Sequence, residues 1–568
     1  MCLVFAYNKT PGNNRAKAHV SNHRCQRPAM HNVISVVLNT TVKNQEFSNP
    51  VDNINCLIKT DNLYQAEAAY QAELQNHTGN IDLHYGYITN HFNLPEKIKT
   101  GKHSYTYRDD ETIMNYYNTL ANETDSATKD RGNYLLGLCY SYKNDNDNAI
   151  KYFKRVKNRN LKYLNNSTGV IYKDRNQLLA IKFFEREIEI DGNLNGAVFN
   201  LSKALIATAD AGKFDALIHN PKTNPYVRLS HKREFYYLKH DFVNYFKTVW
   251  QKFVSTIDNY GFLGALAIAL IWLFYLRHID IYERERWYNI GVVFVLSLML
   301  TEGCYLMYDF ANLSLHFNLN GNILNDLAYC VFGIGLIEEI TKLVPLLIFL
   351  SFSKAVNEPI DYVIYASVSA LGFAFMENIQ YFQNDRYYIM HGRALASVVA
   401  HMCFSSIVAW GFIVSKYKAH YKAFLPVIVC LLIAAIYHGL YDFWLLNDKV
   451  KDFHILTLVI LVSSVLVWNS IKNNALNNST FYNASVKLNR NRIFKYLFIA
   501  LVGVFALEYT IVVINYGPTP GNRLLLQSLL SGSFLFFFMT GKLAQFEIKP
   551  GEWERIKIWE RNEKSGDD

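Results

Sequence analysis

The chain has 568 residues, too many for one ordinary domain, and its mean hydropathy of −0.01 averages two unlike halves. Residues 1 to about 250 are rich in Asn, Tyr, Lys and Asp, whereas apolar runs long enough to cross a bilayer recur from residue 257 onward. A wholly water-soluble protein is therefore excluded. The formal net charge of +9 is not gathered into a Lys/Arg stripe, so we expect no nucleic-acid partner.

Residues 1–55 show no periodic pattern of apolar residues. We expect either a disordered tail or a start that precedes the true initiator, for which Met30 is the candidate. The first residues contain too short an apolar stretch for a signal peptide. The eight Cys lack a CxxC pair and are expected to be reduced thiols. A metal site is not expected here, because no second pair at zinc-finger spacing follows His19, His23, Cys25 and His31.

Residues 56–250 are predicted to form a soluble domain of helix pairs. One copy of an internal repeat contains Gly137, Tyr140, Ala149 and Phe153, the next contains Gly169, Tyr172, Ala180 and Phe184, and a weaker third begins near Ala197. This pattern resembles tetratricopeptide repeats, in which small residues let two helices pack closely. A generic helical bundle is the alternative. In either case we expect no catalysis here, but a spacer or a surface for a protein partner.

Nine apolar segments in the second half are predicted to cross the lipid bilayer as helices, because lipid offers no partner to an unpaired backbone group. They cover residues 257–277, 287–308, 324–352, 360–383, 393–415, 423–446, 453–471, 494–516 and 522–541. The predicted fold is therefore all-α: a soluble helical-repeat domain followed by a polytopic transmembrane helical bundle. The membrane domain covers residues 257–542, with its core at 324–446, and a polar tail follows at 543–568.

The distribution of positive charge predicts the orientation of the bundle. Loops after the first, fifth and seventh spans, and the tail after the ninth, contain several Lys or Arg, whereas the loop after the second span has none. The positive-inside rule places the basic loops in the cytoplasm. Nine spans then put the N-terminal half on the other side without a visible signal peptide. Either the first span translocates that half, or one span is miscounted.

Four consecutive spans contain polar or ionisable residues that should face the interior of the bundle, because a charge at the centre of a span costs about 2.5–3.5 kcal/mol. The third span contains Glu338, Glu339 and Lys342, the fourth Glu377 and Asn378, the fifth His401, and the sixth His438 and Asp442. Counted from one membrane face, the four spans bring these groups to within roughly 10 Å of a common depth. We therefore expect them to converge.

Spacing along single helices predicts two local pairs. Glu338 and Glu339 lie four and three residues before Lys342, so one carboxylate can pair with the ammonium group. His438 and Asp442 are four residues apart, and the carboxylate could fix the tautomer of the imidazole.

These motifs resemble the PrsW family of intramembrane proteases, which is similar to the membrane-embedded CAAX prenyl endopeptidases. The family pattern is a Glu-Glu-x-x-Lys run, a Phe-x-x-x-Glu-Asn motif, a lone His and a His-x-x-x-Asp motif. The corresponding residues are Glu338 to Lys342, Phe373 to Asn378, His401, and His438 to Asp442. The resemblance implies an integral protein of the bacterial cytoplasmic membrane. It also implies hydrolysis of a peptide bond in a membrane-anchored protein substrate, in regulated proteolysis.

Two mechanisms are open for such a site. With a metal, His401, His438 and Glu377 would hold zinc and leave one position open. Without one, His401 and Asn378 would donate hydrogen bonds to the oxyanion, and His438, held by Asp442, would assist proton transfer. In both, Glu339 is the expected general base, with Glu338 beside it.

Two other functions are compatible with buried membrane charges. A proton-coupled transporter would use them as a relay, but it predicts matching broken helices in two halves, and the polar residues occur only in spans three to six. A catalytically inactive adaptor would work through its helical repeats, and replacement of Glu339 or His401 would then change nothing.

Overall fold

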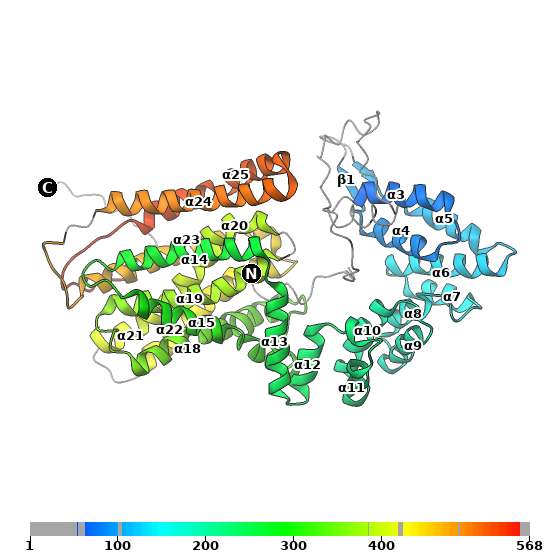
Figure 1. Cartoon of the computed structure of the whole chain (residues 1–568), viewed down its shortest axis with the longest axis horizontal. Helices are drawn as coiled ribbons and strands as arrows, with labels where there is room; N and C mark the ends of the chain where they lie inside the picture. The colour runs from blue at the N-terminus through cyan, green and yellow to red at the C-terminus, as the bar shows by residue number, and fades with distance from the viewer. Residues whose placement is uncertain are drawn as a thin grey trace. The chain divides into compact units, whose positions relative to one another are not determined.

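The structure is a computed structural model that describes residues 54, 63–99, 105–383, 386–418, 424–486 and 489–556. Most of the proposed disordered tail, together with its His/Cys cluster, lies outside these residues. The chain divides into two compact units within one helix, α13 (Phe242–Thr256). We call the described part up to Thr248 the N-terminal unit and the part from Val249 the membrane unit (Figure 1).

The N-terminal unit is built from consecutive antiparallel helices and one small β-hairpin. Its elements are α3 (Leu63–Asn76), α4 (Ile81–Asn93), β1 (Lys97–Lys99), β2 (Tyr105–Tyr107), α5 (Asp110–Ala121), α6 (Ser126–Tyr142), α7 (Asn146–Arg155), α8 (Leu164–Tyr172), α9 (Gln177–Glu189), α10 (Leu194–Ala207), α11 (Ala211–His219) and α12 (Leu229–Leu238). Asn or Asp caps many of these helices and accepts a hydrogen bond from a backbone N–H of the first turn. Among the residues that the structure describes, this hairpin is the only departure from an all-α architecture.

The internal repeat corresponds to successive helix pairs, α6 with α7 and α8 with α9. A Cβ atom at Gly137 would lie 2.6 Å from the Phe153 ring, and one at Gly169 would lie 2.5 Å from the Phe184 ring. Only glycine allows this close approach, which explains why a small and a large residue recur at the same spacing. The resemblance to tetratricopeptide repeats itself remains a prediction.

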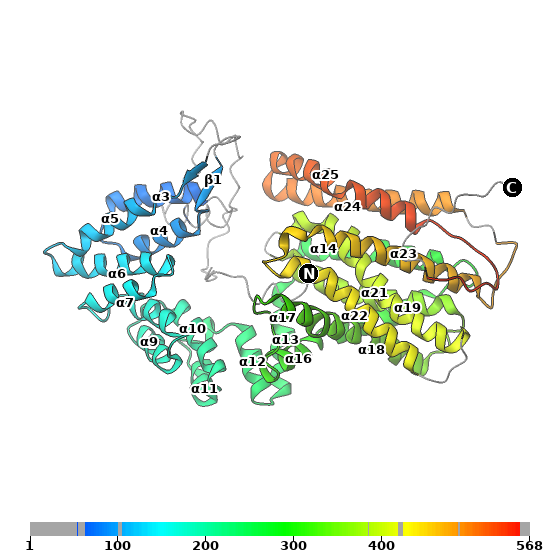
Figure 2. The same ribbon diagram turned by 180° about the vertical axis from the view of Figure 1, so that it is seen from behind.

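The membrane unit is a bundle of long helices (Figure 2). They are α14 (Asn259–Ile279), α15 (Trp287–Thr301), α16 (Cys304–Asp309), α17 (Ile323–Ala328), α18 (Leu336–Phe352), α19 (Pro359–Phe382), α20 (Met390–Gly392), α21 (Val398–Ile413), α22 (Leu425–Leu446), α23 (Ile455–Asn477), α24 (Arg490–Tyr516) and α25 (Pro518–Leu543). π-helical segments continue several of these helices. Phe310–Ser314 follows α16, Tyr329–Gly335 lies between α17 and α18, and Arg393–Ser397 lies between α20 and α21.

Eight helices in the described part of the chain are long and apolar enough to cross a membrane, which supports an integral multi-pass protein. The remaining predicted span, 324–352, is also helical and consists of α17, a π-helical segment and α18. It falls outside the apolar set because it contains several charged residues, among them Glu338, Glu339 and Lys342. The charged residues that exclude this segment from the apolar helices include those predicted to converge with polar residues of the next three spans.

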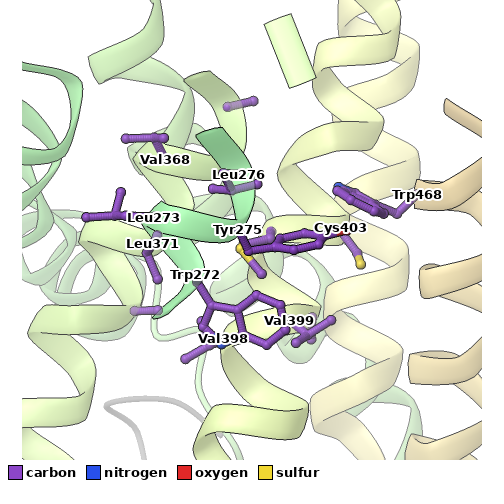
Figure 3. Close-up of a cluster of buried hydrophobic side chains, with 14 of the residues drawn as sticks. Trp272, Leu273, Tyr275, Leu276, Val368, Leu371, Val398, Val399, Cys403 and Trp468 are labelled. Atoms are coloured by element: carbon purple, nitrogen blue, oxygen red, sulfur yellow. The ribbon is translucent and has the colours of Figure 1, made fainter. Parts of the chain in front are cut away.

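Helix α19 is the centre of the bundle, since its most apolar 18-residue window is entirely buried. It packs against α14, α15, α18, α21 and α23. Figure 3 shows part of the surrounding core, in which Trp272 and Tyr275 of α14 lie among side chains of α19, α21 and α23. Polar atoms of these rings are satisfied: Trp272 Nε1 donates to the Ala394 carbonyl at 3.2 Å, and Tyr275 Oη to the Leu543 carbonyl at 2.9 Å.

The first part of the predicted polar tail packs against the bundle. The Phe546 side chain is fully buried, and the buried Lys472 ammonium group of α23 donates to the Gln545 carbonyl at 2.5 Å. Backbone N–H groups of Lys549 and Glu554 donate to Asn side chains near the end of α23, each at 2.7 Å.

Candidate active site

The polar residues predicted in four separate spans meet in one buried cluster. Helix α18 contributes Glu338, Glu339 and Lys342, α19 contributes Glu377 and Asn378, α21 contributes His401, and α22 contributes His438 and Asp442. Each of these residues is at most 3% exposed. The expected convergence across helices is what the structure shows.

Close backbone contacts position α22 beside the start of α18. A Cβ atom at Gly439 would lie 2.5 Å from Val331 Cα, and one at Gly335 would lie 2.6 Å from the Ala435 carbonyl oxygen. Both contacts involve the π-helical segment Tyr329–Gly335, which shifts the side chains that follow it around the helix axis. His438, next to Gly439, is thereby brought against the two carboxylates of α18.

Two carboxylate–histidine pairs link the helices. Glu377 Oε2 lies 2.9 Å from His401 Nε2, and Glu339 Oε1 lies 3.0 Å from His438 Nδ1. In each pair a carboxylate holds one ring nitrogen and so fixes the direction of the other. The expected partner of His438, Asp442, is more distant, with its Oδ2 3.7 Å from Nε2.

Lys342 lies between the acidic residues and the imidazoles. Its Nζ is 2.8 Å from Glu339 Oε1, 3.6 Å from Glu338 Oε2 and 2.8 Å from His401 Nδ1. The spacing argument predicted one carboxylate partner, and the structure gives the ammonium group both. Because Lys342 donates to His401 Nδ1, the proton of His401 is on Nε2 and is donated to Glu377.

Glu338 and Glu339 differ in how far their oxygens are satisfied. Glu339 accepts from Lys342 and His438 at Oε1 and from Ser405 Oγ at Oε2, the last at 2.9 Å. Glu338 Oε1 accepts from Tyr308 at 2.8 Å, but Oε2 is buried without a hydrogen-bond partner. Such an oxygen is costly to bury unless something else binds there.

Arg393 completes the cluster and was not identified from the sequence. From the π-helical segment before α21, it donates to Glu377 Oε2 at 3.0 Å and to Asn378 Oδ1 at 2.7 Å. It is 4% exposed, so its charge compensates Glu377 in the interior. A buried Arg at the start of the predicted fifth span was the signal that could have revealed it.

Three of these residues fit a metal ion. Donor atoms of Glu338, His401 and His438 lie within 4.8 Å of one another. His438 Nδ1 lies 3.0 Å from Glu339 Oε1, and its Nε2 lies 3.4 Å from Glu338 Oε2, the oxygen without a hydrogen-bond partner. With the ring proton on Nδ1, His438 Nε2 and this oxygen would together offer two ligand positions to a cation. Two imidazoles and one carboxylate are also a donor set suited to zinc.

Comparison with known proteins adds independent evidence. A family model described as PrsW family intramembrane metalloprotease matches residues 285–468, which include every residue of the cluster from Tyr308 to Asp442. Protease PrsW of Clostridioides difficile (strain 630) is 30% identical over 215 residues, 36% of this chain and 86% of that protein. Protease PrsW of Geobacillus kaustophilus (strain HTA426) is 29% identical over 191 residues, 33% of this chain and 78% of that protein. No solved structure matches the chain significantly.

Proposed function

The chain belongs to the PrsW family of intramembrane metalloproteases, and we propose that it hydrolyses a peptide bond of a membrane-anchored protein at the cluster between α18, α19, α21 and α22. The observation that carries this assignment is the unsatisfied Glu338 oxygen facing His438 Nε2 in a buried site. A transporter or an adaptor does not require a buried carboxylate oxygen without a hydrogen-bond partner beside two imidazoles.

We assign Glu338, His401 and His438 as the residues that hold zinc. Glu339 and Glu377 then orient the two imidazoles from behind, because each binds the ring nitrogen that does not face the site. This differs from the set expected from the sequence, in which Glu377 was the ligand. Bound zinc supplies a Lewis acid that polarises a peptide carbonyl and lowers the pKa of water.

The surrounding residues serve positioning and proton transfer. Arg393 binds Asn378 Oδ1 and so leaves the Nδ2 donors of Asn378 for the carbonyl oxygen of a substrate. Lys342 donates to His401 Nδ1, so ammonium and metal compete for that nitrogen. If no metal takes part, Glu338 rather than Glu339 is the general base, since both oxygens of Glu339 already accept hydrogen bonds.

The N-terminal unit is proposed to recruit a protein partner and so to make the proteolysis regulated. Support for this role comes from its consecutive helix pairs and from its position outside the part matched by the family model.

The test is cleavage of a labelled single-span substrate by the purified full chain in detergent, measured together with bound zinc per chain. Glu338→Gln and His438→Ala are expected to lower cleavage at least about a thousandfold and to lose zinc. The matched control is Glu508→Gln, because Glu508 is also a buried membrane carboxylate but pairs with His391 at 3.0 Å. This control should retain most of the activity.

Each pattern of results has a distinct meaning. Lost cleavage with zinc absent from the active wild type would replace the metal mechanism by the glutamate mechanism. Wild-type cleavage by Glu338→Gln and His438→Ala would refute the proposed site altogether.

A further inference from the structure

A second buried carboxylate cluster lies at the other end of α19. Asp280 follows the last residue of α14, Glu285 lies in the loop to α15, Glu358 precedes α19, and Asp361 lies in its first turn. All four are at most 8% exposed. Asp361 and Glu377 are 16 residues apart on one helix, about 24 Å, so this cluster is separate from the active site. We call Asp280, Glu285, Glu358 and Asp361 the loop cluster.

Part of the loop cluster is explained by local structure. Asp361 Oδ2 accepts from the backbone N–H groups of Asn357 and Glu358, each at 2.8 Å, as in a helix capping box. Asp280 Oδ2 accepts from the Glu285 N–H at 2.9 Å. Ser479 Oγ donates to Glu358 Oε2. These bonds account for one oxygen of each of the three carboxylates.

Two other oxygens have no such explanation. Asp280 Oδ1 and Glu358 Oε1 are both buried without a hydrogen-bond partner, and both side chains are fully buried. Oxygens of Asp280, Glu358 and Asp361 lie within 4.8 Å of one another. No Lys or Arg in the described part of the chain forms an ion pair with these three residues. Within the described residues these three carboxyl groups therefore have no cationic partner.

The electrostatic consequence is visible in two groups outside the membrane-spanning helices. Burial, followed by repulsion from Glu358, raises the pKa of Asp280 to about 7. Burial, followed by repulsion from Glu283 and Glu285, raises the pKa of Glu358 to about 7. A cation bound between these two carboxyl groups would stabilise their ionised forms and reduce the repulsion between them.

We propose that Asp280, Glu358 and Asp361 bind a hard divalent cation, Mg²⁺ or Ca²⁺, at a site distinct from the catalytic centre. The two unpartnered buried oxygens supply ligand positions, and Asp361 supplies a third. The donor set contains only oxygen, without His or Cys, which favours hard cations over zinc.

The cation would join two segments that are distant in sequence, and a third segment contacts them through Glu358. Asp280 belongs to the loop between α14 and α15, Glu358 and Asp361 to the start of α19, and Ser479 to the segment after α23. Because α19 also carries Glu377 at its other end, the site would anchor the central helix on which the active site is built.

The test uses Mn²⁺ as a paramagnetic probe on the full chain in detergent, after removal of divalent ions by a chelator. Wild type is expected to bind one Mn²⁺ per chain that Mg²⁺ or Ca²⁺ displaces. Asp280→Asn and Glu358→Gln should each weaken this binding at least about tenfold. Glu338→Gln should keep it, because Glu338 belongs to the other site. Failure of the active-site assignment would thus leave this result unchanged.

Thermal unfolding separates loss of binding from loss of folding. With the chelator present, both loop-cluster variants should unfold no earlier than wild type, because each removes one of several like charges. Added Mn²⁺ should raise the unfolding temperature of wild type but not of either variant. Absence of Mn²⁺ binding by wild type up to about 10 mM, or equal binding by wild type and Asp280→Asn, would overturn the proposal.

Discussion

The N-terminal unit and the membrane unit each bury a carboxylate completely, but they treat it in opposite ways. Glu187, in α9, accepts hydrogen bonds from the backbone N–H groups of Tyr163, Asn166 and Asn193 at 2.6, 3.0 and 2.8 Å. Glu338, in α18, has one oxygen satisfied by Tyr308 and the other without a hydrogen-bond partner. Burial alone therefore does not indicate function.

The difference between Glu187 and Glu338 shows which feature of a buried carboxylate does indicate function. The oxygens of Glu187 are satisfied by backbone groups that the fold itself supplies, so this carboxylate holds two helix pairs together. Oxygens of Glu338, Glu339 and Glu377 instead contact side chains from several helices, and Glu338 Oε2 has no hydrogen-bond partner. Groups left unsatisfied in the interior are those to which a proton, a metal or a substrate can bind.

The largest change is expected at Arg393. Arg393→Gln would leave the buried Glu377 without its cation, and we expect the membrane unit to lose about 3–5 kcal/mol of stability, along with cleavage. Thermal unfolding in detergent measures this. Arg393→Lys keeps the charge and should recover part of the stability. An unchanged unfolding temperature in Arg393→Gln would show that Glu377 is neutral in the folded protein.

Glu187→Gln tests the other side of the comparison. The new amide would place N–H donors where backbone N–H groups already point, so we expect the N-terminal unit to lose about 2–3 kcal/mol. Hydrogen exchange of peptides from α8 and α9 in the full chain would report it, while cleavage stays within about twofold of wild type. Glu185→Gln is the control and should change neither, because Glu185 is partly exposed and pairs only with the exposed Lys213. A strong loss of cleavage in Glu187→Gln would mean that the two units are coupled.

A third prediction concerns the close packing behind His438. Gly439→Ala would force α22 away from Val331, at a cost of about 1–3 kcal/mol, and should lower cleavage by roughly tenfold because His438 moves with it. Gly503→Ala, at a helix position with nothing within 4 Å, should leave cleavage as it is. Equal activity of the two variants would argue that the position of His438 is not critical.

The smallest effect near neutral pH is a pH dependence confined to the N-terminal unit. Burial, followed by repulsion from Arg228, lowers the pKa of His231 to about 3, and its ring accepts from or donates to Ser202 at 2.6 Å. The unfolded chain therefore binds a proton that the folded unit does not, and stability should fall as pH drops below about 6.5, by about 1.4 kcal/mol per pH unit.

Urea titration followed by hydrogen exchange of α10 to α12 would measure this slope. His231→Gln should flatten it. A slope that is the same in both proteins would place the titrating group elsewhere.

The sequence alone determined a large part of the site. Helical spacing predicted the pairing of Lys342 with a carboxylate, and equal depth in four spans predicted that these spans converge. The pairing could be predicted because contacts within a helix depend only on its period. The convergence could be predicted because charged residues of a membrane helix must face the interior of the bundle. The motifs that carry these residues were sufficient to identify the protease family.

Only the tertiary structure decided which groups meet across helices. Glu338, not Glu377, lies with both histidines, and Arg393 and Tyr308 join from segments that no motif marked. The loop cluster likewise forms from residues about 80 positions apart. Such contacts depend on the axial shift and rotation of packed helices, which glycine contacts and π-helical segments set. The spacing of residues along one helix does not determine the axial shift or the rotation of that helix against its neighbours.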